Sequence, residues 1–233
     1  MTETSTGARS RRSLLKTGGV LAGTLFIPDL AAASFRMANP APAPRTPEAY
    51  LPPKAFAQPI TSPRVVRPDL MRRAMASLDA HSSHGITRDR FAIADFAAPS
   101  NERRFHIVDL TNGHSTSFLV AHGSGSDPAH TGWLQRFSNE QGSNASSEGA
   151  FRTDDYYYGQ HGRSQRLVGL DSTNNNALDR AIVVHAAWYS NPDMIAKHGM
   201  LGRSQGCFAV GDDDLARVFD RLGPNRMIFA AKI

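Results

Sequence analysis

The sequence has only one cysteine, Cys207, so no disulfide can form within the chain. Cysteine usage therefore gives no information on the redox compartment in which the protein folds. Long hydrophobic runs are lacking as well. The most apolar stretch, residues 17–27, has about 11 residues, whereas a helix that spans a bilayer needs about 20. This stretch is therefore too short for a membrane-spanning helix.

A strong excess of charge of one sign is also absent. The net charge is +5, and the first 33 residues contribute four basic and two acidic side chains to it. The rest of the chain has 22 Lys and Arg against 19 Asp and Glu, and these are scattered along it. Such a balance gives no reason to expect a nucleic-acid partner.

The first 33 residues have the pattern of an export signal. A basic patch at residues 9–16 precedes the short apolar run, and Ala31-Ala32-Ala33 offers small residues for cleavage. Arg11 and Arg12, followed by Leu-Leu-Lys, resemble a twin-arginine signal. We therefore predict recognition by the twin-arginine export machinery through residues 9–33, and a protein that works in the periplasm or cell envelope.

The exported part divides into an arm and one domain. Residues 34–67 are rich in Ala and Pro, which favours an extended linker or surface arm. A domain is predicted over residues 68–233. It begins with a helix, since Pro68 suits a first helical turn and an apolar stripe follows at helical spacing. The stripe consists of Leu70, Met71, Ala74, Met75 and Leu78.

Strand patterns dominate the remainder, so a mainly β fold with two or three short helices is expected. Asn112-Gly113 predicts a tight turn between the second and third strands. Residues 123–149 form a long Gly-, Ser- and Asn-rich loop, a length that is usually functional or disordered. A helical turn is expected at residues 176–180 and a helix near residues 212–222. The expected strands are residues 90–96, 104–110, 115–121, 150–152, 156–158, 166–170, 181–186 and 227–233, and the first two are interpreted as alternating apolar and polar residues.

The residues with the clearest chemical meaning are His185 and Cys207. His185 ends an apolar strand, and Ser204-Gln205-Gly206-Cys207 follows about twenty residues later. Gly206 permits a backbone conformation that a side chain would forbid, and amides of such a turn can bind an oxyanion. A nearby histidine can draw the proton from a thiol that is mostly neutral at pH 7. These groups suffice for acyl transfer through a thioester. The same sequence pattern is also compatible with an inert buried cysteine and a histidine that only packs in the core.

The pattern resembles the catalytic domain of the L,D-transpeptidases, the YkuD fold, and in particular the murein L,D-transpeptidase catalytic domain family. The resemblance runs from about residue 91 to residue 233. Besides His185 it includes residues 139–149, Tyr158-Gly-x-His161-Gly162 and residues 202–210. It implies a β-sandwich or barrel-like catalytic domain that acts on peptidoglycan stem peptides and needs no metal or other cofactor.

The resemblance also implies a role for each matching residue. Cys207 would be the nucleophile, and it would attack the carbonyl between an L-centre and a D-centre of a stem peptide. His185 would be the base, oriented by the carbonyl of Ala186. The amides of Gly206 and Cys207 would form the oxyanion hole, and Ser204 would shape the turn. An amine from a second stem peptide, or water, would then resolve the thioester.

Two departures from the family pattern concern substrate binding. Gln205 replaces a histidine that commonly precedes the Gly-Cys pair, and Ala209 and Val210 stand where an Arg or Asn is often found. Gln205 can neither act as a base nor carry charge. Arg203 or His198 could supply the missing contact to substrate.

Three further residues are weaker candidates for lining the cleft. His122 and Gly123 end a strand and open the long loop, and His161 precedes Gly162 in a second His-Gly pair. A structural role is also open for each of them.

Two other classes of protein remain as alternatives. A zinc hydrolase could draw ligands from the nine histidines, but the sequence has no His-Glu-x-x-His or similarly compact ligand spacing. A non-catalytic envelope protein could bind glycan or peptide in the same cleft, which the departure at Gln205 would suit. Within the enzyme class, carboxypeptidase or amide hydrolase activity is an alternative to cross-linking.

Overall fold

The computed structural model describes residues 65–233. The predicted export signal, residues 1–33, lies outside the described residues, as does most of the predicted arm at residues 34–67. At the start of the described part, Val66 is buried and Arg67 forms an ion pair with Asp95, with 2.7 Å between Nη2 and Oδ1. Contacts of the domain thus begin slightly before the predicted start at Pro68.

The described part contains three α-helices and eight strands, which confirms the predicted mainly β fold with two or three short helices. The helices are α1 (Pro68–Ala80), α2 (Pro192–His198) and α3 (Leu215–Leu222). The strands are β1 (Arg90–Asp95), β2 (Phe105–Asp109), β3 (Ser115–Phe118), β4 (Gly149–Gly159), β5 (Gly162–Gly169), β6 (Val183–Ala186), β7 (Phe208–Val210) and β8 (Met227–Ala231). Among these elements no helix is long and apolar enough to cross a membrane.

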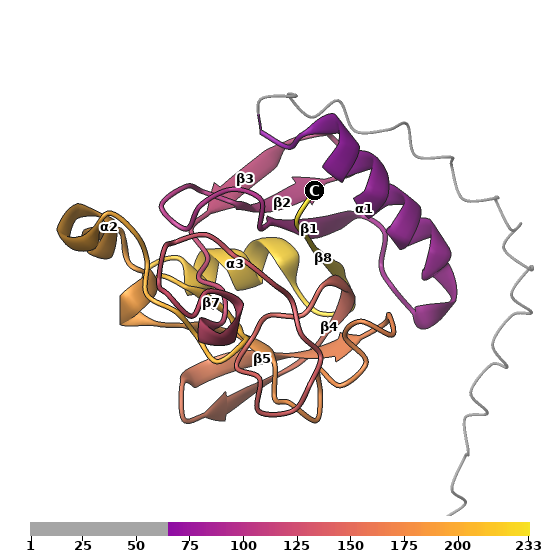
Figure 1. Cartoon of the computed structure of the whole chain (residues 1–233). Coiled ribbons are helices and arrows are strands. Elements are labelled where there is room, and N and C mark those ends of the chain that lie inside the picture. Colours follow the sequence, from indigo (N-terminus) through magenta and orange to yellow (C-terminus); the bar gives the residue numbers. More distant parts are fainter. Residues whose placement is uncertain (1–64) are drawn as a thin grey trace, which may run out of the picture. The chain divides into compact units, whose positions relative to one another are not determined.

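The eight strands form one mixed sheet in the order β3-β2-β1-β8-β4-β5-β6-β7. The pairs β1–β8 and β6–β7 are parallel, and the other neighbours are antiparallel. Two isolated bridges join the two edges of the sheet. The amide of Ala121, beyond β3, donates to the carbonyl of Ala209 in β7 (2.8 Å), and Gly123 pairs with Ser204, which precedes β7. The sheet therefore curves back on itself in a barrel-like manner (Figure 1).

The central strands are buried on both faces, which corrects the interpretation of β1 and β2 as alternating apolar and polar strands. In β1, Ala92 and Ala94 face the inner core with α3, whereas Phe91 and Ile93 pack with α1 on the other face. The neighbouring β8 divides its residues in the same way. A strand covered on both sides has little need of polar side chains, as is usual around parallel pairs.

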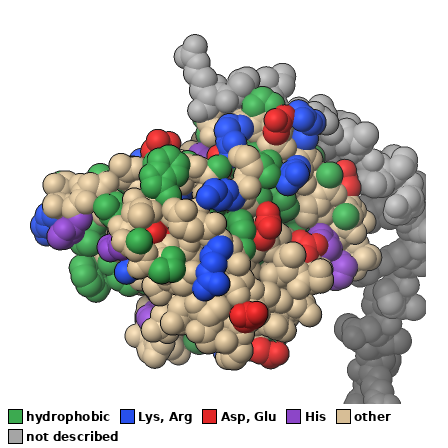
Figure 2. Space-filling view, viewed as in Figure 1, with side chains coloured by type: hydrophobic (Ala, Val, Ile, Leu, Met, Phe, Trp, Pro, Cys, Tyr) green, Lys and Arg blue, Asp and Glu red, His purple; other side chains and the backbone are tan. Residues whose placement is uncertain are grey.

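Helix α1 covers one face of the sheet, as the apolar stripe predicts. Leu70, Ala74 and Leu78 are fully buried against the strands, and α1 lies along one side of the domain in Figure 1. On the face shown in Figure 2, basic and acidic side chains are interspersed.

Three elements differ from the sequence expectation. The predicted pieces at residues 150–152 and 156–158 belong to one long strand, β4, with a register shift between Thr153 and Tyr156. Strand β7 was not predicted, whereas the helical turn expected at residues 176–180 is present, since the amide of Arg180 donates to the carbonyl of Asn176 (2.9 Å). Helix α2 was not predicted, although Pro192 in its first turn and the left-handed Gly199 after its end are ordinary helix-boundary signals.

Candidate active site

A pocket of about 440 Å³ brings together the residues that the sequence singles out. It lies where β6 and β7 run side by side and where the tip of the β4–β5 hairpin reaches over them. Six predicted site residues line it, namely Cys207, His185, Ser204, Gln205, Arg203 and His161. The parallel pairing places Ala186 beside Val210, so the segments that carry the histidine and the cysteine are held in register.

Cys207 directly precedes β7 and is 8% exposed. Its Sγ lies 3.6 Å from the carbonyl oxygen of Ala181, a geometry in which the thiol donates a hydrogen bond. Burial raises the pKa of the thiol, although the amide of Val183 and the charge of Arg180 act in the opposite direction. The resting thiol is therefore neutral at pH 7, and its hydrogen bond is directed to Ala181 rather than to His185.

His185 is held in one tautomer by its own strand. Its Nδ1 lies 2.8 Å from the carbonyl oxygen of Ala186, which can only accept, so Nδ1 carries a proton. Nε2 is therefore left with the lone pair that a base requires. Burial lowers the pKa of His185, and the charge of His161 acts in the same direction, whereas the bond to Ala186 opposes both. The imidazole is accordingly neutral at pH 7.

Ser204 closes the turn that leads to Cys207. Its Oγ accepts a hydrogen bond from the amide of Gly206 (3.1 Å) and donates one to the carbonyl of Cys207 (2.7 Å). This is the shaping of the turn that the sequence suggests. It also changes the expected oxyanion hole, because the Gly206 amide is already engaged and the Cys207 amide remains as the candidate donor.

Gly206 is required by both conformation and space. Its φ of +113° lies in a region that residues with side chains rarely adopt, and an added Cβ would lie 2.7 Å from the carbonyl oxygen of Ala145. Gly123 packs against the same turn, since its Cβ would lie 2.8 Å from the Gly206 amide nitrogen. The amide of Gly123 donates to Ser146 Oγ at 3.0 Å. Gly123 thus supports the turn from behind and does not line the pocket.

The sequence pattern of the L,D-transpeptidase catalytic domain family matches residues 63–231, well over half of the chain. The chain belongs to this family. No curated protein sequence matches it significantly.

Solved L,D-transpeptidases are similar to the chain only distantly. One from Mycobacterium smegmatis is 13% identical, with 61% of this chain and 58% of that chain covered and a TM-score of 0.37. L,D-transpeptidase 1 of Mycobacterium tuberculosis is 14% identical, with 60% of each chain covered and a TM-score of 0.35. The chain thus spans about three fifths of these proteins.

Two further candidates, His198 and His122, also lie outside the pocket of this L,D-transpeptidase domain. His198 is exposed at the end of α2 and takes no part in lining the pocket. His122 is only 1% exposed and is enclosed by a polar network, which corrects the expectation that it lines the cleft. Arg104 Nη2 donates to its Nδ1 (2.7 Å), and its Nε2 lies 3.5 Å from Asp127 Oδ2. Burial, together with the charge of Arg104, lowers the pKa of His122 to about 3.

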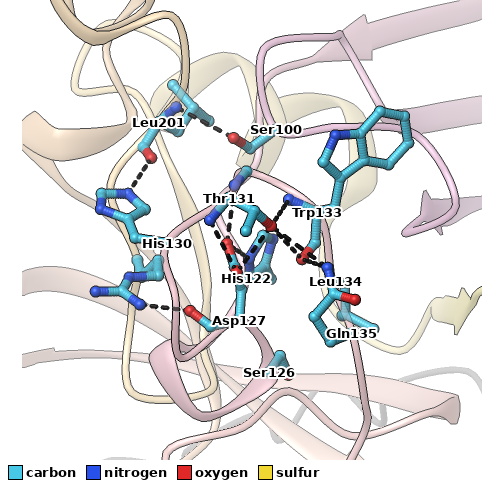
Figure 3. Close-up of polar contacts among 12 residues, drawn as sticks. Ser100, His122, Ser126, Asp127, His130, Thr131, Trp133, Leu134, Gln135 and Leu201 are labelled. Carbon is cyan, nitrogen blue, oxygen red and sulfur yellow. Dashed lines mark hydrogen bonds and ion pairs between the residues drawn. The ribbon is translucent and has the colours of Figure 1, made fainter.

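The carboxylate of Asp127 organises the start of the long loop (Figure 3). It accepts hydrogen bonds from the amides of Thr131 and Gly132, each 2.9 Å long, and from the Thr131 hydroxyl at 3.0 Å. Although burial opposes ionisation, these bonds hold the pKa of Asp127 below its ordinary value. The first part of the loop is therefore a rigid structure built around one buried anion.

This rigid part also holds the segment that precedes the cysteine. Figure 3 shows His130 directed at the carbonyl of Leu201, at 3.0 Å, and the amide of Leu201 bound to Ser100 Oγ, at 3.2 Å. Arg203 donates to the carbonyl of Asp127 and, at 3.1 Å, to that of Pro128. The role expected for Arg203 is therefore partly structural, although its side chain also lines the pocket.

Several pocket residues were not predicted from the sequence. These are Gln141, Gly142, Asn144, Gln160, Arg180, Ala181 and Tyr189. They come from the long loop, the β4–β5 turn and the segments that flank β6, which have no shared motif. The titratable side chains of the lining are Arg180, Arg203, His161, His185, Tyr189 and Cys207, and the lining includes no Asp or Glu. A pocket with this composition favours a ligand that carries a carboxylate.

Proposed function

We propose that this L,D-transpeptidase domain transfers acyl groups between peptidoglycan stem peptides through a thioester on Cys207, and that it acts in the periplasm or cell envelope after export. The observation that carries the proposal is the shared pocket of Cys207 and His185, with His185 Nδ1 fixed by the Ala186 carbonyl and Nε2 free to accept a proton. Stem peptides bear carboxylates, which suits a lining that has two arginines and no acidic residue.

The first half-reaction forms the thioester. Rotation of the Cys207 side chain moves Sγ from the Ala181 carbonyl toward His185, whose Nε2 takes the thiol proton. Sγ then bonds to the carbonyl carbon between the L-centre and the D-centre. The negative charge that develops on the oxygen is stabilised by the Cys207 amide, and the Gly206 amide can join it only by releasing Ser204.

The first half-reaction ends when the bond between the carbonyl carbon and the leaving nitrogen breaks and His185 gives its proton to that amine, which leaves the thioester. The second half-reaction consumes this thioester. An amine of a second stem peptide then attacks the same carbon, its proton passes to His185, and the carbon–sulfur bond breaks with return of the proton to sulfur. With water as the attacking group the same residues give a carboxypeptidase or amide hydrolase.

The test incubates the full chain with purified disaccharide-tetrapeptide and follows the products by mass spectrometry. The matched control is Cys207→Ala. A dimer mass, or exchange of the terminal D-residue, that is lost in the control supports transpeptidation. Loss of the terminal D-residue without any dimer indicates carboxypeptidase activity. If the wild type and the control are equally inert, the catalytic proposal fails and a non-catalytic envelope protein becomes the better account.

Two further measurements separate the remaining alternatives. The thioester mechanism predicts that carbapenem-type β-lactams acylate Cys207, with the mass increase absent in Cys207→Ala. A zinc hydrolase predicts loss of activity with chelators, which the thioester mechanism does not.

A further inference from the structure

Arg180 links the long loop to the base of the pocket. Its Nη1 donates to the carbonyl of Ser138 (2.8 Å) and to Ser147 Oγ (2.6 Å). Its Nη2 donates to the carbonyl of Ala145 (2.6 Å) and to Ser143 Oγ (3.2 Å). One guanidinium therefore fixes four points of the loop, and through them one wall of the pocket.

The charge of Arg180 has no counter-ion in the part of the chain that the structure describes. All four of its acceptors are neutral carbonyls or hydroxyls, and within residues 65–233 Arg180 forms no ion pair. Arg67 and Arg226, by contrast, pair with aspartates. A part-buried cation without an anion stabilises whatever negative charge forms near it.

A group of the same pocket that can become an anion is the proposed nucleophile, Cys207. A Cβ on Gly206 would lie 3.2 Å from Arg180 Nη2, so the guanidinium rests against the backbone that leads into Cys207. Sγ of Cys207 contacts the carbonyl of Ala181, the residue that follows Arg180. The other titratable side chains of the pocket are His161, His185, Tyr189 and Arg203, and the lining includes no Asp or Glu.

We propose that Arg180 is a positioning residue of this active site, which uses its charge to favour the thiolate of Cys207 and its hydrogen bonds to hold the loop against the catalytic turn. The inference rests on the proposed role of Cys207 as nucleophile. The effect on the thiolate and the effect on the loop come from two separate properties of the Arg180 side chain. The charge acts on sulfur, whereas the forked hydrogen bonds act on residues 138–147.

The test measures the rate of Cys207 alkylation by iodoacetamide between pH 6 and pH 10 in the full-length protein, because this reaction reports the thiolate without any peptidoglycan. Arg180→Gln removes the charge, and we expect the alkylation pKa to rise by about one unit, with an approximately tenfold lower rate at pH 7. Arg136→Gln is the matched control, since Arg136 is an arginine of the same loop that binds the carbonyl of Gly125. It should leave the thiol pKa unchanged.

Two more variants separate the effect of the Arg180 charge from the effect of its hydrogen bonds to the loop. Arg180→Lys keeps the charge but loses the forked guanidinium that binds four acceptors of the loop. It should therefore lower the melting temperature and keep the thiol pKa of the wild type. Ser147→Ala removes one acceptor of the clamp and keeps the charge, and the same result is expected. If Arg180→Gln does not fold, Arg180→Lys carries the test, and a rise of one unit in its thiol pKa would overturn the proposal.

A wild-type thiol pKa in Arg180→Gln, or an equal rise in Arg136→Gln, would also overturn it. The proposed function can fail separately. If the protein transfers no stem peptide but its thiol pKa depends on Arg180, the inference about Arg180 holds and the proposed reaction is wrong. If the protein has transpeptidase activity but its thiol pKa does not depend on Arg180, the proposed reaction holds and the inference about Arg180 is wrong.

Discussion

The imidazole of His161 stacks on that of His185, with ring centroids 4.3 Å apart and an angle of 21° between the planes. His161 stands at the β4–β5 turn, and His185 lies on β6, which pairs with β5. The hairpin tip therefore places a second titratable ring on the proposed base. Its charge contributes to the lowered pKa of His185, after burial.

Replacing His161 by Phe keeps a stacking ring and removes the charge. We expect the pKa of His185 to rise, by up to about one unit. Because a base must be neutral to accept a proton, the acidic limb of the pH profile of kcat/KM should move to higher pH. His198→Phe, at the exposed end of α2, is the control and should leave the limb in place. An unmoved limb in His161→Phe would show that His161 has no electrostatic effect on the base.

Ser204→Ala should remove the bridge that shapes the catalytic turn. The Gly206 amide and the Cys207 carbonyl would both lose their partner, and unsatisfied buried groups cost about 1–3 kcal/mol each. We expect a lower free energy of unfolding in urea and a lower kcat with a less affected KM. Ser190→Ala is the matched control, because the buried Ser190 hydroxyl has no partner among the described residues. Equal losses in the two variants would contradict the role of Ser204.

Gly206→Ala should abolish thioester formation. The new Cβ would collide with the Ala145 carbonyl at a φ of +113°, so the turn has to move. Gly85→Ala provides the comparison, since Gly85 also has a positive φ (+68°) but has no atom within 4 Å of its Cβ position. That variant should lose about 1 kcal/mol of stability from backbone strain and keep full activity. A carbapenem acylation assay on Gly206→Ala checks the first expectation, and measurable acylation would count against it.

Acid should destabilise the domain through His122. Its pKa is about 3 in the folded protein and about 6.5 when unfolded, so between these values the unfolded chain binds a proton that the folded chain does not. The free energy of unfolding should therefore fall by up to about 1.4 kcal/mol for each unit as pH drops from 6.5 toward 3.

His122→Gln isolates this contribution, because Gln can still accept from Arg104 but cannot take up a proton in this range. Burial also lowers the pKa values of His106 and His185, and each adds its own pH dependence to the free energy of unfolding. The difference between the wild type and His122→Gln in urea unfolding at pH 4 to 6 is thus the quantity to measure. Parallel curves would mean that His122 is already charged in the folded state.

Much of the site could be predicted because its features are local. Ser204, Gly206 and Cys207 lie within four residues, so the bridge of the hydroxyl and the positive φ act inside one turn. The bond from His185 to Ala186 likewise joins adjacent residues. Helix α1 and most strands could also be predicted from the sequence, since the spacing of their apolar residues reflects the surfaces that they bury.

Some failures of prediction concern strands whose surroundings cannot be read from their own residues. Whether β1 has one buried face or two depends on α1 and α3 lying on opposite sides of it. The continuity of β4 depends on its pairing with both β5 and β8. Helix α2 is a different case, because Pro192 and Gly199 were present in the sequence as boundary signals.

By itself, then, the sequence determined which groups are available for the proposed chemistry: one cysteine, a histidine at the end of a strand and a glycine in the turn between Ser204 and Cys207. The tertiary structure decided what surrounds them. It encloses His122 between Arg104 and Asp127, stacks His161 on His185, and brings Arg180 to the residue before Cys207. Apart from the pair of His122 and Asp127, these contacts join residues that are at least 18 positions apart in the chain. Their energies depend on distance, burial and neighbouring charge, which exist only once the chain has folded.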